Sequence, residues 1–279
     1  MKFGIHASIA GGIDQAVLRA AKLECGTLQI FSTNPRGWKS REISDDEVSK
    51  LQHNLVENNI APLVIHTPYL LNLASPKEEL YNKSITALKQ GVKRADKLGA
   101  KYLVLHPGSH TGSGIEAGIK RIGAGLKQVI SETKPEVMIL LENVAGRGTS
   151  IGASFEELAK IISLVDDSKK LGICFDTCHG FAAGYDLRNK NEVDKILSQV
   201  DSIFGIDKLG VIHANDSKGA FDSNKDRHEH IGQGKIGLSG FRNLLNHPLL
   251  TDKTVILETP VNDEGNDKHN LATLRSLVN

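Results

Sequence analysis

The stretch LVIHTPYLLNLASPKEELYNKSITALKQGVKRADKLGAKYLVLH, residues 63–106, contains a complete strand, helix and strand in that order. It begins with the apolar run LVIHT (63–67) and ends with the apolar run YLVLH (102–106), and residues 75–99 between them are rich in helix-forming residues. Both apolar runs are continuous rather than alternating, as expected for strands that are buried on both faces of a parallel sheet. The stretch therefore predicts a β/α/β unit.

The same alternation extends over the whole chain. Further apolar runs are KFGIH (2–6), LQIFS (28–32), MILLEN (138–143), GICFDT (172–177), GVIHAN (210–215) and VILET (255–259). Further helix-patterned stretches are residues 14–24, 45–59 and 154–165.

Two helix starts carry capping signals. Ser154 and Glu157 form a capping-box pattern, and Ser75 precedes Pro76, which suits the first helical position.

Eight β/α units without a second domain predict a single-domain (β/α)8 TIM barrel over residues 1–279, with the active site at the C-terminal ends of the strands. The structural alternative is an open doubly wound sheet. That fold would normally carry a glycine-rich phosphate turn after its first strand, and Gly11-Gly12 does not fit that fingerprint.

Composition narrows the class of protein. The chain has 279 residues, no apolar run of about 18 residues that would span a membrane, and no signal-like N-terminal segment. Its three cysteines, Cys25, Cys174 and Cys178, do not form a disulfide framework, so we expect a reducing cytoplasm. The net charge of +1 and the pI of 7.8 do not by themselves indicate a nucleic-acid-binding protein, which is usually more basic.

Polar, metal-ligating side chains stand at or just after the ends of the apolar runs. In a barrel these C-terminal strand ends converge on one face. The residues concerned are His66, His106, Glu142, Asp176, His179, His213, Asp226, His228 and Glu258.

Each of these residues taken alone has a structural explanation, because a single strand-end histidine is usually a hydrogen-bonded structural residue, and Glu142 could pair with Arg147. Together, however, four carboxylates and five imidazoles converge, and few Lys or Arg residues lie nearby in the sequence to compensate them. Burying several ionised carboxylates without cations costs several kcal/mol each.

Bound metal ions explain this set economically. Imidazole and carboxylate ligands suit catalytic Zn²⁺, with Mn²⁺ or Fe²⁺ as possible substitutes. Nine ligands suit two or three ions with a bridging carboxylate, and the charge balance favours three, because three Zn²⁺ ions leave the cluster positive.

Longer motifs resemble those of the endonuclease IV family, the AP endonuclease family 2 enzymes that nick DNA at abasic sites. The similar segments occur in the family's order and reach from the first strand to the last. They are HASIAGG (6–12), HTPYLLNLASP (66–76), HPGSH (106–110), LLENVAG (140–146), CFDTCHGFAAGYD (174–186), IHANDSK (212–218), DRHEHIGQGKIG (226–237) and LETP (257–260).

The resemblance implies three zinc ions. His66 and His106 would bind the first ion, and the bridging carboxylate of Glu142 would join it to the second. Asp176, His213 and Glu258 would complete the second ion's ligands. His179, Asp226 and His228 would bind the third.

The resemblance also implies a function. The expected reaction is hydrolysis of the phosphodiester 5′ to an abasic site by a metal-activated hydroxide that attacks phosphorus, with removal of blocked 3′ ends by similar chemistry. The products would be a 3′-hydroxyl and a 5′-deoxyribose phosphate. We expect double-stranded DNA with abasic sites or blocked 3′ ends as partner, no membrane, no obligate protein partner and a monomer.

Other residues are candidates for substrate contact or for orienting the ligands. Arg36 and Tyr69 are expected to act as wedges in the DNA groove, and Asn34, Trp38 and Lys39 to contact DNA. Packing of its own loop is an equally good explanation for Trp38. His6, His110 and His230 are expected to orient ligands or to contact substrate.

Two other classes of protein remain open. A sugar isomerase or epimerase on the same barrel would use Glu142, Asp176, His213 and Glu258 around one ion, leaving the other five ligands without a role. A non-catalytic metal-binding or DNA-binding module would explain metal affinity alone.

Overall fold

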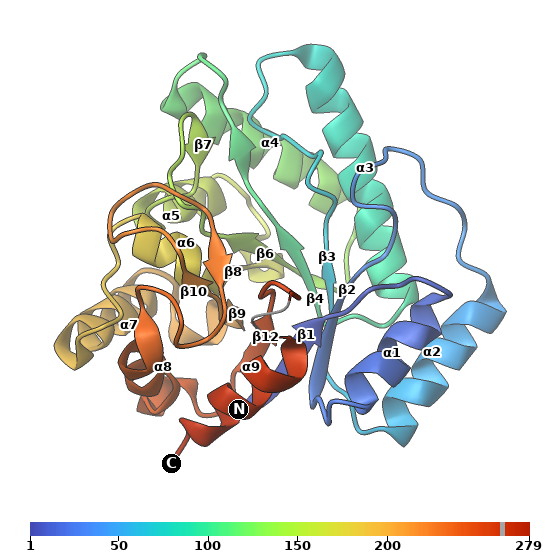
Figure 1. The fold of residues 1–279 in the computed structure, drawn as a ribbon. Coiled ribbons are helices and arrows are strands. Elements are labelled where there is room, and N and C mark those ends of the chain that lie inside the picture. Colours follow the sequence, from blue (N-terminus) through green and yellow to red (C-terminus); the bar gives the residue numbers. More distant parts are fainter. Residues whose placement is uncertain (263–265) are drawn as a thin grey trace.

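The computed structural model describes residues 1–262 and 266–279, and its central feature is a closed barrel of parallel strands (Figure 1). Neighbouring strands follow the order β1-β12-β9-β8-β6-β4-β3-β2, and β2 pairs with β1 to close the ring. The strands are β1 (Lys2–His6), β2 (Thr27–Phe31), β3 (Leu63–His66), β4 (Tyr102–Leu105), β6 (Met138–Glu142), β8 (Leu171–Asp176), β9 (Leu209–His213) and β12 (Thr254–Leu257). The predicted TIM barrel is confirmed.

Helices cover the outside of this barrel (Figure 1). They are α1 (Ile13–Ala21), α2 (Asp45–Glu57), α3 (Glu78–Lys97), α4 (Ile115–Thr133), α5 (Phe155–Ser163), α7 (Lys190–Phe204), α8 (Gly237–Leu245) and α9 (Asp267–Ser276), with 3₁₀ turns at Ser168–Lys170, Ile206–Lys208 and Pro248–Leu250. The short helix α6 (Thr177–Ala182) is buried and lies at the end of β8 instead. Each of the longer helices buries an apolar stripe against the strands and leaves its polar side in solvent, as in α3, where Ile85, Leu88 and Val92 are buried.

The two capping signals differ in outcome. The Ser154 side chain caps α5 by accepting a hydrogen bond from the Glu157 backbone amide at 3.3 Å. The Glu157 carboxylate does not return this bond to Ser154, because it accepts from the backbone amides of Gly152 and Ala153 instead.

The prediction that Ser75 caps α3 is wrong. The Ser75 hydroxyl accepts from the Lys77 amide at 3.1 Å, which makes a local turn, and the helix begins one residue after Lys77.

Two layers of apolar side chains hold the barrel. One lies between strands and helices and includes Phe155, Phe175 and Phe241. The other fills the barrel interior with Val64, Tyr102, Val104, Leu140, Cys174, Val211 and Ile256. Because side chains fill the interior, a functional site has room only at a mouth of the barrel.

The segments that follow the strands build up the C-terminal mouth. The ladder of β5 (Gly108–Ser109) with β7 (Ser150–Ile151) follows β4 and β6, and the ladder of β10 (Asp216–Ser217) with β11 (His228–Glu229) follows β9. The short helix α6 directly continues β8. These segments carry several of the candidate ligands and give them defined positions.

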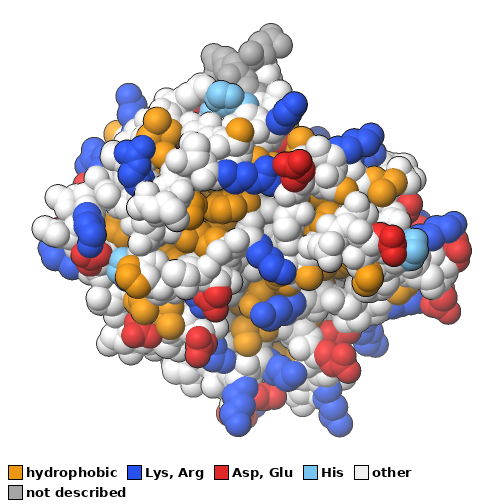
Figure 2. All heavy atoms as spheres, turned by 90° about the horizontal axis from the view of Figure 1, so that it is seen from below, with side chains coloured by type: hydrophobic (Ala, Val, Ile, Leu, Met, Phe, Trp, Pro, Cys, Tyr) orange, Lys and Arg blue, Asp and Glu red, His pale blue; other side chains and the backbone are white. Residues whose placement is uncertain are grey.

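The surface is mixed in charge. Seen from below, Lys and Arg side chains are interspersed with Asp and Glu side chains, and hydrophobic side chains are visible between them near the middle (Figure 2). This distribution agrees with the net charge of +1. Within residues 1–262 and 266–279, no helix combines the length and apolar character that a membrane crossing requires.

Candidate metal centre

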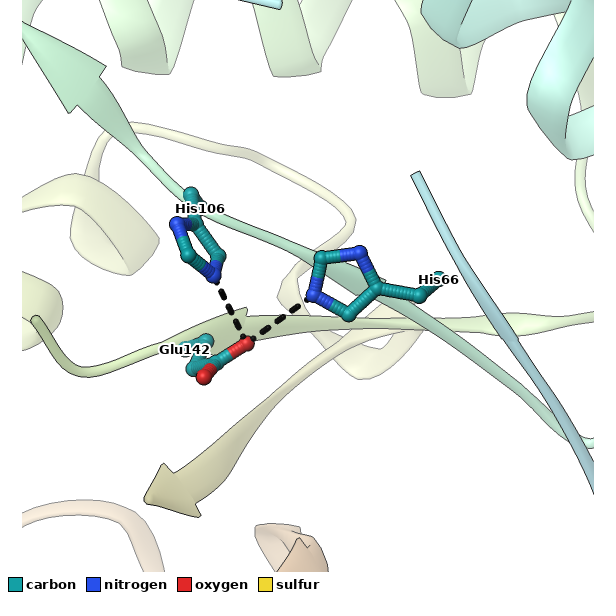
Figure 3. Close-up of side chains that lie close together, drawn as sticks. All are labelled: His66, His106 and Glu142. Atoms are coloured by element: carbon teal, nitrogen blue, oxygen red, sulfur yellow. Dashed lines mark hydrogen bonds and ion pairs between the residues drawn. The ribbon is translucent and has the colours of Figure 1, made fainter. Parts of the chain in front are cut away.

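The carboxylate of Glu142, at the end of β6, lies at the centre of the site and is fully buried. Its Oε2 atom lies 3.2 Å from Nε2 of His66 and 3.1 Å from Nε2 of His106, so that both imidazoles point at the same oxygen (Figure 3). Its Oε1 atom lies 3.2 Å from Nδ1 of His213 and 3.3 Å from Nδ1 of His179. One carboxylate therefore faces two imidazoles with each oxygen, which is the position expected of a bridging ligand.

The second set of ligands shares Glu142 with the first. Ligand atoms of Glu142, Asp176, His213 and Glu258 all lie within 4.8 Å of one another, which is close enough for one ion between them. They come from β6, β8, β9 and the residue after β12, strands that are neighbours in the barrel. The ligands of the predicted second ion thus meet because of the strand order.

The third set lies on the segments that rise above the strands. Nε2 of His179, from α6, lies 3.3 Å from Oδ1 of Asp226, and Nε2 of His228, from β11, lies 3.5 Å from the same oxygen. The Nδ1 atom of His228 is engaged with the backbone oxygen of Glu258 at 2.9 Å. This leaves Nε2 of His228 buried without a hydrogen-bond partner and facing carboxylates.

The donor set fits divalent metal ions. A buried imidazole nitrogen without a partner is costly unless an ion or a water satisfies it. His179 shows the arrangement typical of a ligand, because Nδ1 lies 3.0 Å from the backbone oxygen of Asn143 and Nε2 faces Asp226. His66, His106 and Glu142 likewise have ligand atoms within 4.8 Å of one another, as do His179, Asp226 and His228.

The charges of these neighbouring groups shift one another's pKa values even without ions. Burial alone would raise the pKa of Glu142, but the charge and hydrogen bonds of His106, His213 and His179 hold it well below its ordinary value. Burial alone would lower the pKa of His179, but Asp176 and Asp226 raise it well above its ordinary value. The pKa of Asp226 is lowered to about 2, because its contact with His179 outweighs its partial loss of solvent.

Several buried amide side chains around the ligands were not anticipated. Gln29, in β2, contacts both His213 and Glu258. Asn215 donates to Oδ2 of Asp176 at 2.6 Å and accepts from the backbone amide of Glu258 at 2.8 Å. The signal was present in the sequence, because Gln29 is a polar residue inside an apolar run and Asn215 is the last residue of another.

Asp216 is a further buried carboxylate that the sequence analysis did not single out. Its two oxygens accept hydrogen bonds from the backbone amides of Ser217, Gly232, Gly234, Ile236 and Gly237. The side chain therefore fixes the loop that follows β11.

The three additional histidines behave differently from one another. Nδ1 of His6 lies 2.7 Å from Oε1 of Glu258, so His6 contacts a candidate ligand. His110 instead accepts hydrogen bonds from the amides of Gly112 and Gly114 and shapes the loop before α4. His230 is buried and bonded to Asn262 and Asn270, which ties the segment after β11 to α9.

The three cysteines are buried and unpaired. The Sγ atom of Cys178 lies within 4.8 Å of ligand atoms of Asp176 and His228, so Cys178 is close to the candidate centre. Burial raises the pKa of its thiol to about 12, which favours the neutral form over a thiolate ligand.

Candidate DNA-contacting residues lie on the loops after β2 and β3. The Tyr69 side chain is 59% exposed, and its ring centroid lies 5.6 Å from that of His66 and 6.0 Å from that of His106. Asn34, Arg36 and Lys39 are exposed, and Oδ1 of Asn34 accepts a hydrogen bond from the Arg36 amide, so Asn34 shapes its own loop.

Trp38 is 39% exposed and borders a hollow of about 460 Å³ beside α3.

Comparisons with known proteins identify the family and the fold that the chain shares. The family described as a xylose isomerase-like TIM barrel matches residues 17–277. A protein named probable endonuclease 4 from Halothermothrix orenii is 52% identical over 268 residues, covering 96% of each chain. The crystal structure of endonuclease IV from Thermus thermophilus matches with a TM-score of 0.88 and 36% identity, covering 99% of this chain and 98% of that one.

The barrel itself is shared more widely. The structure of a D-tagatose 3-epimerase-like protein matches with a TM-score of 0.75 over 99% of this chain and 97% of that chain. Its sequence is 22% identical, so this likeness shows the fold alone.

Proposed function

The chain belongs to the endonuclease 4 family, and from this premise we propose that it is a metal-dependent DNA-repair endonuclease that hydrolyses the phosphodiester 5′ to an abasic site. One observation carries the proposal. The nine candidate ligands fall into three contiguous groups, and the buried carboxylate of Glu142 belongs to two of them. Such an arrangement suits several adjacent ions, and phosphodiester hydrolysis is a reaction that adjacent divalent ions catalyse.

The ligand set favours this activity over sugar isomerisation. An isomerase or epimerase would need only the group of Glu142, Asp176, His213 and Glu258 around one ion. The other five candidate ligands, which include the buried His66 and His179, would have no role in such an enzyme. The buried Nε2 of His228, which has no hydrogen-bond partner, would also be left unexplained.

We propose three Zn²⁺ ions per chain, with Mn²⁺ or Fe²⁺ as substitutes. His66, His106 and Glu142 would hold the first ion, Glu142, Asp176, His213 and Glu258 the second, and His179, Asp226 and His228 the third. When bound, such ions lower the pKa of water to near neutrality and neutralise the charge that develops on a phosphodiester. The backbone carbonyl of Asn143 would orient His179, and the side-chain amide of Asn215 would orient Asp176.

Selectivity for an abasic site would come from the exposed loops beside the centre. A nucleotide without a base costs less to turn out of the duplex. The ring of Tyr69 lies beside those of His66 and His106, which supports a role in which it would stack into the opened duplex next to the sugar that enters the site. Arg36, which is exposed on the neighbouring loop, would accompany it.

The proposed products are a 3′-hydroxyl and a 5′-deoxyribose phosphate, and the same site would remove 3′-phosphates and other 3′ blocks. We further propose that residues 1–279 form one domain, that the protein works as a monomer without an obligate protein partner, and that it acts in the cytoplasm.

A duplex with one abasic site, labelled at either end of the damaged strand, tests the proposal. Protein stripped with a chelator should leave the duplex intact, and zinc should restore a single nick that a polymerase can extend. Binding without a nick in the zinc-restored protein would favour a non-catalytic module. Conversion of a ketohexose without any nick would favour an epimerase.

A further inference from the structure

The strand β2 contributes no candidate ligand, yet it places an amide side chain among the ligands. Gln29 lies in the middle of this strand and is fully buried. Its oxygen Oε1 lies 2.9 Å from Nε2 of His213, and its nitrogen Nε2 lies 2.7 Å from Oε1 of Glu258. One side chain thus contacts two candidate ligands of the same ion.

The orientation of this amide is determined by its neighbours. Facing Glu258, the amide must present its NH₂ group, because an amide oxygen would be repelled by the carboxylate. The amide oxygen then faces His213 and can only accept a hydrogen bond. His213 must therefore carry its proton on Nε2.

This hydrogen bond selects the atoms that remain for a metal ion. With its proton on Nε2, neutral His213 keeps a lone pair on Nδ1, which lies 3.2 Å from Glu142 Oε1 and 3.4 Å from Glu258 Oε2. On Glu258, Oε1 is occupied by Gln29 and by His6, which leaves Oε2 on the side of His213.

We propose that Gln29 is a positioning residue for the second ion, which sets the tautomer of His213 and the free oxygen of Glu258. This inference rests on the proposed metal centre and adds a residue to it. A buried amide that merely satisfies its own hydrogen bonds would have no selective effect on one ion of the cluster. Loss of a partner behind a metal ligand typically weakens metal affinity by about 10- to 100-fold.

The test measures zinc binding rather than activity. Gln29→Met keeps the length of the side chain and removes both hydrogen bonds to the ligands. Gln90→Met is the matched control, because Gln90 lies on α3 and its Oε1 contacts Ser40 rather than a ligand. Both variants and the parent protein are stripped of metal and titrated with Zn²⁺ against a chromophoric chelator, and the unfolding temperature of each metal-free protein is measured.

We expect one zinc equivalent to be about 10- to 100-fold weaker in Gln29→Met, with the other equivalents close to those of the parent and of Gln90→Met. Unchanged affinity of every equivalent would overturn the inference. Equal weakening of all equivalents, together with a lower unfolding temperature of the metal-free variant, would also overturn it and leave a purely structural role. Absence of zinc binding by the parent protein would instead refute the proposed metal centre, and with it the role of Gln29.

Discussion

Replacing Glu142 by Gln should abolish phosphodiester hydrolysis while leaving the barrel intact. The amide keeps the shape of the side chain but removes the charge that two cations would share. The carboxylate oxygens lie 3.1–3.2 Å from the ligand nitrogens of His66, His106 and His213, so the ions that these nitrogens would hold would be near neighbours of the charge. At 3.2 Å and an effective dielectric constant of about 20, one unit charge interacts with another by about 5 kcal/mol.

A loss of this size accounts for a large kinetic effect. If about 4 kcal/mol of it is expressed in the transition state, the rate falls about 10³-fold. The assay is single-turnover cleavage of a duplex with one abasic site, measured at saturating Zn²⁺ together with the metal content of the variant.

Glu229→Gln provides the matched control. Glu229 is a carboxylate of the same region that bonds the His230 amide and Lys218 and is not a candidate ligand. A Glu142→Gln protein that cleaves at near-parental rates, or a Glu229→Gln protein that loses as much activity, would refute the bridging role.

The remaining predictions concern recognition, stability and pH. Tyr69→Ala should weaken binding to an internal abasic site by about 5- to 150-fold, since a base–aromatic stack contributes about 1–3 kcal/mol, and Arg36→Ala should weaken it as well. Both should affect a frayed 3′-phosphate end less, and equal losses on the two substrates at one salt concentration would exclude lesion recognition by these loops. Asp216→Asn keeps the shape but leaves some of the backbone amides it binds unpaired, and it should lower the free energy of unfolding in urea by about 2–4 kcal/mol. A change below about 0.5 kcal/mol would contradict this role. In metal-free protein the raised pKa of His179 contributes stability that is fully present below about pH 6.5 and is lost as the pH rises through the folded pKa. Because the pKa of Asp226 is lowered to about 2, this carboxylate contributes stability that is present above about pH 4 and is lost as the pH falls toward 2. The stability of zinc-loaded protein should instead increase with pH above about pH 5, because acid protonates the ligands. The rise in unfolding temperature on zinc addition should therefore grow from about pH 5.5 to about pH 8.5. A zinc effect independent of pH would show that these groups are not ligands.

The sequence predicts the barrel well because its strands are buried on both faces. The continuous apolar runs mark the strands to within one or two residues, as with the run 63–67 and the strand Leu63–His66. The candidate ligands were found for the same reason, since a His or Glu that ends an apolar run is conspicuous. Parallel strands then bring these ends to one mouth of the barrel whatever the loops do.

The remainder depends on tertiary contacts that no local pattern encodes. Gln29 has a role only because β2 lies next to β1 in the closed ring and faces β9 and β12 across the mouth. Asp216 binds amides up to 21 residues later in the chain, which requires the folded loop. The start of α3 was misplaced because Ser75 forms a two-residue turn that resembles a cap in sequence.

The number of metal ions per active chain tests the central claim most directly. Protein purified without chelators should be analysed for its elements and, in the same preparation, for cleavage of a duplex with one abasic site. We expect close to three equivalents of transition metal, mainly zinc, with activity falling as equivalents are removed. Full cleavage activity with a reproducible single equivalent would contradict the three-ion centre.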